Sequence, residues 1–377
     1  MPSISLEPMT VLQNGWYNGL VAELHLDPNM FQIRQPLLPI SHSDQGLWAH
    51  QDVIPPISLT FNTSICNSYQ FSDEYISVVS ELQYPVDNFR QDIGEDVYQK
   101  WLAYLKQINP SPAKNQLPAL FRQWSILNAP SVMSAGVSAL SKIALISSAQ
   151  QGLLPYQGSN AKPIDFSGSY DQLLQLLGNS SGRSLSFESN STSKDVEHTW
   201  SGGNNVALDG LWAGGCSTSR LSRRFALSKV KVSAQFKAYT LWTSTPGSWY
   251  NSSLLNTAYS SQKTPPWPLN ANPTWAEVFG QDGSMQRLIA SMVVVDGINA
   301  TITSDVSYSK TDQQTIQRNA SKGLWPFYAP TNNGTATNEV NFDNTKGMKI
   351  KTVTQPGNPL VIGNNVLAIA QYLGHAG

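Results

Sequence analysis

Two histidines and one aspartate near the N-terminus form the densest group of side chains that could carry chemistry. They are His42, Asp44 and His50. Two imidazoles and a carboxylate can supply three ligands to a metal ion, or an acid and a base, if their loop folds back on itself. The spacing matches no established metal motif, and polar loop residues among prolines are the alternative interpretation. The metal hypothesis predicts a metal-dependent enzyme centred on these three residues.

Other signals for catalysis are weak. The sequence contains neither a His-Glu-x-x-His nor a Cys-x-x-Cys motif. A thiolate phosphate-binding loop at Cys216 would need an arginine six positions later, but residue 222 is serine. The arginines that follow this cysteine are therefore interpreted as basic residues that solvate the start of a strand; they are Arg220, Arg223 and Arg224. We assign no catalytic residue, and the cofactor stays open.

Aromatic side chains gather in Pro- and Gly-rich loops of the C-terminal half. An aromatic ring offers an apolar face and a polar edge, which suits stacking on a sugar or insertion at a membrane interface. We therefore expect a ligand-binding role, with a glycan or a membrane lipid as partner, for Trp249, Tyr250, Trp267, Trp275, Trp325, Phe327 and Tyr328. The alternative is that these rings anchor their loops onto a sheet.

The charge balance argues against nucleic acid as a partner and permits self-association. Charged residues are 13% of the 377, about half the usual share, and the net charge is -1. Such a chain has no long-range attraction to polyanions, so we expect no nucleic-acid binding. A surface of low charge also permits self-association into a homo-oligomer. The two cysteines, Cys66 and Cys216, could form a disulfide or remain thiols.

Three regions are expected along the chain. Residues 1–155 begin Pro-rich and irregular and continue as a helical bundle region. Residues 156–220 are a connection rich in Gly, Ser and Asn, and residues 221–377 form an antiparallel β region. The predicted fold class is α+β, with a helical N-terminal half packed on a C-terminal antiparallel β-sheet or sandwich.

Hydrophobic periodicity predicts the elements of the first half. Apolar residues at helical spacing indicate helices from about residue 93, over 117–127 and over 131–149. Asp92 and Glu95 fit a capping box at the start of the first of these. A further helical patch is expected at 170–177, and short strands are expected at 19–26 and 57–65.

In the second half the period changes to two. Residues 229–242 alternate apolar and polar, which predicts a long half-buried strand with its even positions facing the core. Thr274 should begin a short helix that Gly280 ends. A hairpin turn is expected at Asp296–Gly297, and a last hairpin over 347–370 should turn at Pro356–Gly357.

These patterns favour a non-catalytic binding or membrane-active protein, lectin-like or toxin-like, that uses the loop aromatics. The metal-dependent enzyme and a self-assembling structural protein are the alternatives, so enzymatic activity stays undecided. No run approaches 18 apolar residues, and the N-terminus lacks a basic region followed by an apolar one. We therefore expect neither a transmembrane helix nor a signal peptide, and the compartment stays open.

Overall fold

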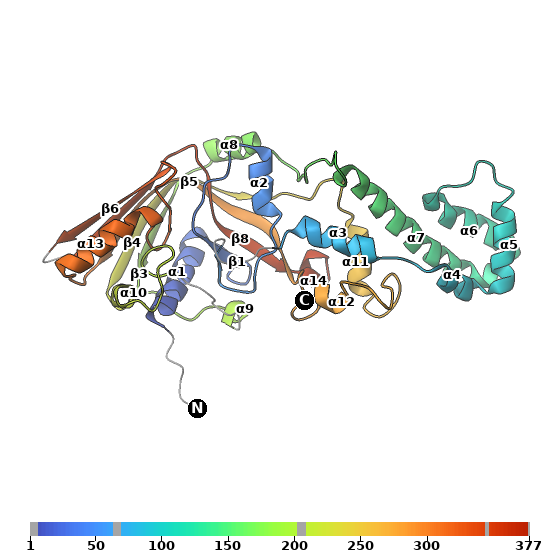
Figure 1. Ribbon diagram of the computed structural model, residues 1–377, viewed down its shortest axis with the longest axis horizontal. Helices are drawn as coiled ribbons and strands as arrows, with labels where there is room; N and C mark the ends of the chain where they lie inside the picture. Colours follow the sequence, from blue (N-terminus) through green and yellow to red (C-terminus); the bar gives the residue numbers. More distant parts are fainter. Residues whose placement is uncertain (1–6, 63–68, 202–208, 344–346, 376–377) are drawn as a thin grey trace, which may run out of the picture. The chain divides into compact units, whose positions relative to one another are not determined.

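A computed structural model describes residues 7–62, 69–201, 209–343 and 347–375. Helices dominate the first half of the chain, and an eight-stranded, mostly antiparallel sheet is built largely from the second half (Figure 1). The predicted α+β fold class is confirmed.

The chain forms two compact units, and each is assembled from three segments. Unit 1 contains Met1–Ser68, Gly168–Ser244 and Arg287–Leu367. Unit 2 contains Tyr69–Ser167, Thr245–Gln286 and Ala368–Gly377. The sheet belongs to unit 1, whereas unit 2 is built from helices and loops.

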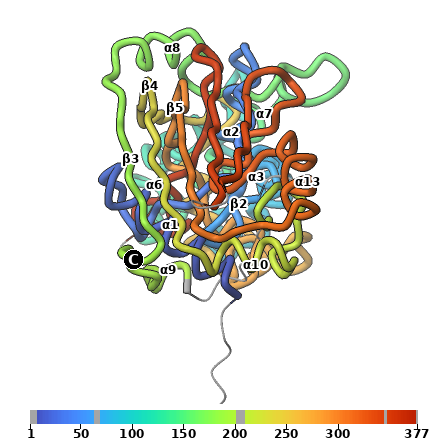
Figure 2. Tube along the Cα trace, turned by 90° about the vertical axis from the view of Figure 1, so that its left-hand side faces the viewer, coloured from blue at the N-terminus to red at the C-terminus, as the bar shows by residue number. Residues whose placement is uncertain are grey.

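The sheet of unit 1 has the strand order β2-β1-β8-β5-β4-β3, and the β6–β7 pair joins it through β5. Strands β1 and β2 pair in parallel, whereas β3, β4, β5, β6 and β7 pair antiparallel. Figure 2 shows β3, β4 and β5 side by side. The strands are β1 Phe31–Gln35, β2 Thr60–Asn62, β3 Arg183–Glu188, β4 Val230–Trp242, β5 Arg287–Ser304, β6 Ala336–Asp343, β7 Gly347–Thr354 and β8 Leu360–Ala368.

Strand β4 confirms the long strand predicted from the period of two. Buried and exposed residues alternate strictly from Val230 to Ala238, because successive side chains leave opposite faces of a sheet. Phe236 is buried and Lys231 is exposed, as their even and odd positions predict.

The predicted turn at Asp296–Gly297 is wrong, because β5 continues through it as one strand of 18 residues. Gly297 has a positive φ of 65° and lies against the Lys237 side chain, and the pairing of β5 with β4 continues in register on both sides of it. The Asp296 carboxylate accepts a hydrogen bond from the amide of Gly357. The chain does turn at Pro356–Gly357, as expected. The hairpin expected over 347–370 is not formed, because β7 pairs with β5 and β6, whereas β8 pairs with β1 and β5.

The helices of unit 1 begin with α1, where a short strand was expected at 19–26. Pro8 suits the first helical turn, and the buried residues Trp16, Leu20 and Leu24 recur every four residues on one helical face. The helix ends at His25 in the left-handed conformation. The helices are α1 Pro8–Leu24, α2 Asp44–Gln51, α8 Tyr170–Asn179, α9 His198–Ser201, α10 Arg220–Ala226 and α13 Lys310–Asn319, with a 3-10 turn at Ala320–Lys322. Of the strand expected at 57–65, Thr60–Asn62 forms β2, and residues 63–65 lie outside the described part.

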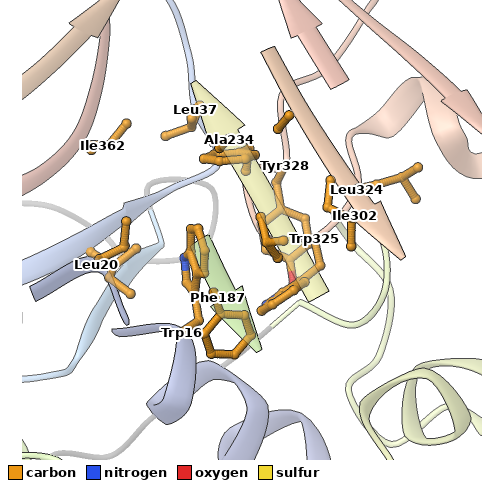
Figure 3. Close-up of a cluster of buried hydrophobic side chains, with 14 of the residues drawn as sticks. Trp16, Leu20, Leu37, Phe187, Ala234, Ile302, Leu324, Trp325, Tyr328 and Ile362 are labelled. Carbon is orange, nitrogen blue, oxygen red and sulfur yellow. The ribbon is translucent and has the colours of Figure 1, made fainter. Parts of the chain in front are cut away.

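The core of unit 1 joins residues far apart in the sequence. Trp16 of α1 packs edge-to-face on Phe187 of β3 and on Trp325, with ring centroids 5.6 and 5.7 Å apart. Figure 3 shows these rings beside aliphatic side chains from the sheet. Burial of these large rings contributes to the driving force for folding unit 1.

Unit 2 confirms two of the predicted helices and corrects a third. Those expected at 117–127 and 131–149 are α6 and α7, but Gly94, with a φ of 81°, divides the helical segment near residue 93 into α4 and α5. Asp92 caps no helix and instead accepts a hydrogen bond from the Tyr84 hydroxyl. The helices are α3 Phe71–Glu81, α4 Val86–Ile93, α5 Glu95–Leu105, α6 Leu117–Asn128, α7 Met133–Leu153, α11 Ser252–Ser260, α12 Trp275–Phe279 and α14 Ile369–Tyr372, with 3-10 turns at Lys114–Gln116, Pro130–Val132 and Leu154–Tyr156.

One described helical stretch, Pro130–Tyr156, is long and apolar enough to cross a membrane by length and composition alone, and 28% of its most apolar window is buried. Ser134, Ser138 and Ser141 lie exposed along one face of α7. This weakly apolar helix is compatible with the expected lack of a transmembrane segment. Cys216 is an exposed free thiol, and Cys66 lies outside the described residues.

Candidate ligand-binding pocket

The three predicted metal ligands do not converge on one point. The His42 ring stacks on Tyr170 with centroids 5.4 Å apart, and its Nε2 atom lies 3.3 Å from the Asn358 side chain. The Asp44 carboxylate accepts a hydrogen bond of 2.7 Å from the amide of Tyr170, the first residue of α8. That amide has no partner within its own helix, so Asp44 has a structural role.

His50 lies at the other end of α2, beside a buried cation. The Arg34 guanidinium donates to the His50 carbonyl, and its carbon atom lies 5.3 Å from the centre of the Phe61 ring. Burial and the charge of Arg34 lower the pKa of His50 to about 3. A positive neighbour disfavours a bound cation. Within the described ranges, no three His, Cys, Asp or Glu side chains are placed to hold a metal ion. The predicted metal site is therefore not assembled.

Three of the predicted ligand-binding aromatics are core residues of unit 1. Trp325 is 0% exposed, and its indole nitrogen donates to the Gln13 side chain at 3.0 Å. Phe327 and Tyr328 are also buried, and the Tyr328 hydroxyl donates to the Gly210 carbonyl. These rings anchor their loop to the sheet and have no surface left for a ligand.

Trp249 and Tyr250 belong to an aromatic cluster in unit 2. Trp249 is 0% exposed, donates to the Asp165 carbonyl, and packs against Phe71 with centroids 5.7 Å apart. Tyr250 is partly exposed and lines a cavity of about 470 Å³ together with Tyr372. Its hydroxyl is buried without a hydrogen-bond partner, and burial raises the pKa of Tyr250 well above its usual value.

Trp267 and Trp275 are the two predicted aromatics that share a pocket. They line a cavity of about 450 Å³ in unit 2, a volume within the range of small-ligand sites. Trp267 is 7% exposed and Trp275 is partly exposed. The loop between the two rings contains Pro268 and the fully exposed Leu269, which line the same cavity.

The end of α11 fixes both indole rings. The Trp267 indole nitrogen donates to the carbonyl of Ala258, and that of Trp275 donates to the carbonyl of Tyr259, each at 2.8 Å. The Ala258 carbonyl also accepts from the Ser261 amide, and the two indole bonds tie both rings to the last turn of α11. Phe279 packs against both rings, with centroids 6.2 and 5.9 Å away. Because the N–H groups are already bonded, the rings can offer a ligand only their carbon surface.

The sequence correctly predicts how Trp275 is positioned. Thr274 caps α12, its hydroxyl accepts from the amide of Glu277, and the Glu277 carboxylate accepts from the Thr274 amide. Hydrogen bonds from Thr274 lower the pKa of Glu277. This reciprocal cap holds Trp275 at the first position of a five-residue helix that ends before Gly280, as expected.

The pocket also has polar groups among its lining residues. Gln262, Lys263 and Thr274 supply the polar atoms among the lining residues. None of the residues that line the cavity is an Asp, Glu, His or Cys. Most glycoside hydrolysis uses two carboxyl groups, which this lining does not supply. The lining residues offer a ligand an amide, an ammonium group and a hydroxyl beside the two rings.

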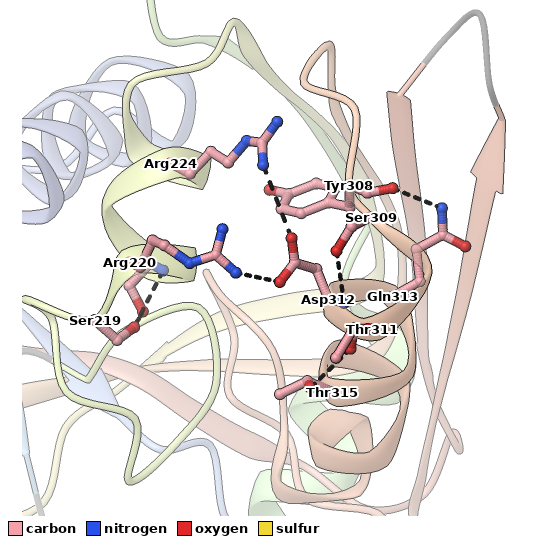
Figure 4. A network of polar contacts seen from close by, with 10 residues as sticks. Ser219, Arg220, Arg224, Tyr308, Ser309, Thr311, Asp312, Gln313 and Thr315 are labelled. Atoms are coloured by element: carbon pink, nitrogen blue, oxygen red, sulfur yellow. Dashed lines mark hydrogen bonds and ion pairs between the residues drawn. The ribbon is translucent and has the colours of Figure 1, made fainter.

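An arginine network in unit 1 was not predicted. Arg220 and Arg224 lie on helix α10, not at the start of a strand, and both pair with the buried carboxylate of Asp312 on α13 (Figure 4). The Arg224 guanidinium also lies over the Tyr308 ring, 5.5 Å from its centre. Although burial alone would raise the pKa of Asp312, hydrogen bonds from Ser309 and Arg220 lower it below its usual value. This network joins two helices and has a structural role.

One further motif occurs in the chain. Residues 178–182 read Gly-x-Ser-x-Gly, the pattern of a nucleophile elbow. That elbow requires a strand followed by a helix, whereas here α8 precedes β3. The Ser180 hydroxyl donates to the Leu177 carbonyl and accepts from the Tyr239 amide. Ser180 therefore ends a helix and is not placed as a nucleophile.

Comparisons with protein-family models, with curated proteins and with solved structures found no match to this chain. The geometry of the pockets is therefore the ground for any assignment of function.

Proposed function

We propose that the protein is a non-catalytic binding protein, and that the pocket of Trp267 and Trp275 in unit 2 binds one sugar residue of a glycan. The observation that carries this proposal is the pair of indoles whose N–H groups are both bonded to α11. Trp275 is partly exposed, so its carbon surface remains for stacking, and the more buried Trp267 forms the adjoining wall. A sugar ring has an apolar C–H face that fits such a surface.

The polar residues of the pocket support the same class of ligand. Gln262 has an amide and Lys263 has an ammonium group, and both side chains are exposed beside the two rings. Sugar hydroxyl groups can accept hydrogen bonds from both and can donate to the amide oxygen of Gln262. A ligand with one apolar face and hydroxyl groups along its edge therefore matches both parts of the pocket.

Replacing Trp275 by alanine should weaken glycan binding roughly tenfold to a hundredfold, because contact with a large apolar side chain contributes about 1.5–3 kcal/mol. A glycan array identifies the oligosaccharide that binds most tightly, and calorimetry then measures its affinity for each variant. Trp48→Ala is the matched control, since Trp48 is also partly exposed and donates its indole N–H to a backbone carbonyl, that of Gly168 in unit 1. Equal losses in the two variants, or no binding by the wild type, would count against the proposal.

Leu269 favours a second candidate function, attachment to a membrane surface. A fully exposed leucine beside two tryptophans and a lysine is a combination found at membrane interfaces. Sedimentation with liposomes tests it through Leu269→Ser, which should abolish retention on the liposomes. Retention of the variant at the wild-type level would exclude this second function.

A further inference from the structure

A third cavity, in unit 1, combines apolar side chains with two basic side chains. It is bounded by α1, the end of β3 and α10, and it has a volume of about 290 Å³. Val11, Leu12 and Phe187 form much of the wall, and Leu227 lies at the edge with 69% of its surface exposed. These side chains and the exposed leucine give an alkyl chain apolar surface to contact beside the polar part of the lining.

The charge of this cavity is not balanced within its walls. Lys194 and Arg223 line it, and none of its lining residues carries a carboxylate. On the same helix, Arg220 and Arg224 both pair with Asp312. Within the described ranges, Arg223 and Lys194 form neither an ion pair nor a side-chain hydrogen bond. Two cations beside an apolar wall are therefore free to meet an external anion.

We propose that this cavity binds a single-chain amphiphile with an anionic headgroup. The alkyl chain lies against Val11 and Phe187, and the headgroup accepts hydrogen bonds from Arg223 and Lys194. Hydrogen bonds between charged partners are about twice as strong as neutral ones, so they can fix the headgroup even at an exposed edge. Ser189 and Asn190 also line the cavity and add neutral polar atoms. Carboxylate and phosphate headgroups share this chemistry.

Calorimetric titration at pH 7 with decanoate, decyl phosphate, decanol and acetate tests the proposal. Decanoate or decyl phosphate should bind, and the stronger of the two identifies the headgroup. In the double variant Arg223→Gln with Lys194→Gln, the affinity should fall about tenfold or more, because charged hydrogen bonds are lost. Arg122→Gln is the control, since Arg122 is an exposed arginine on α6 of unit 2, and it should bind as the wild type does.

The variant Val11→Ser tests the role of the apolar wall. Val11 is partly exposed, so Val11→Ser should leave the fold intact, which circular dichroism checks, and should weaken binding of the amphiphile severalfold. Failure of both anionic amphiphiles to bind would overturn the proposal, as would wild-type affinity in the double variant. If decanol bound as tightly as the anionic amphiphiles, the role of the two cations would be refuted. If acetate bound as tightly as decanoate, the role of the wall would be refuted.

Discussion

Replacing Phe236 by alanine is expected to lower the free energy of unfolding of unit 1 by about 3–5 kcal/mol. The ring is 2% exposed and packs edge-to-face on Phe327, with centroids 6.3 Å apart. Its removal leaves a cavity in the core under β4, and β4 cannot move to fill it because it is paired with β3 and β5 on both sides. Hydrogen exchange of the β4 amides measures the change, since it reports the opening of unit 1 separately from unit 2.

Lys231→Gln on the same strand is the control for Phe236→Ala. Lys231 pairs with Glu188 at 2.5 Å, but both side chains are more than a third exposed. An ion pair that is exposed to water contributes little to stability, so Lys231→Gln should lower the free energy of unfolding by less than about 1 kcal/mol. Comparable losses at the two positions would mean that β4 does not bury its even face.

Acid is expected to destabilise unit 1 through His50. The folded pKa of His50, about 3, lies below the usual value of 6.5, because the ring is buried and Arg34 is close. Below pH 6.5 the His50 imidazole therefore takes up a proton in the unfolded chain but stays neutral in the folded chain. The stability that His50 contributes is complete above pH 6.5, declines as the pH falls, and is fully lost near pH 3. Between pH 6.5 and pH 4 the loss should be roughly 2–3 kcal/mol.

His50→Leu isolates this effect from the titration of carboxylates. The Nδ1 atom of His50 is buried without a hydrogen-bond partner, so an apolar side chain suits its surroundings. Denaturant unfolding of both proteins at several pH values gives the two stability curves. The wild-type curve should fall below that of the variant as the pH decreases, and parallel curves would show that His50 does not stay neutral in the folded state.

Sequence patterns predicted those elements whose side chains follow a simple period. Strand β4 and helices α6 and α7 are of this kind, because one face of each is buried along its whole length. The Asp-Gly pair in β5 misled the prediction, since a glycine with positive φ can lie within a paired strand as well as form a turn. Strand β3 was missed because it is short, exposed on one face, and lies in a Ser-rich segment.

The candidate site was predicted in part. Trp267 and Trp275 were expected to bind a ligand, and they do line one pocket, because their loops return to the end of α11. Composition could not separate them from Trp249 and Trp325, which lie in similar loops but pack into cores. That difference depends on which distant segments meet, and each unit here is assembled from three separate segments. The cavity at Arg223 escaped prediction for the same reason.

The central claim is that a ligand meets the rings of Trp267 and Trp275. Nuclear magnetic resonance of the indole N–H groups tests it most directly, because the 11 tryptophans each give one assignable signal. During titration with the tightest-binding oligosaccharide from the array, the signals of Trp267 and Trp275 should move in proportion to occupancy, while those of Trp48, Trp249 and Trp325 stay in place. Shifts at those three tryptophans with none at Trp267 and Trp275 would contradict the claim.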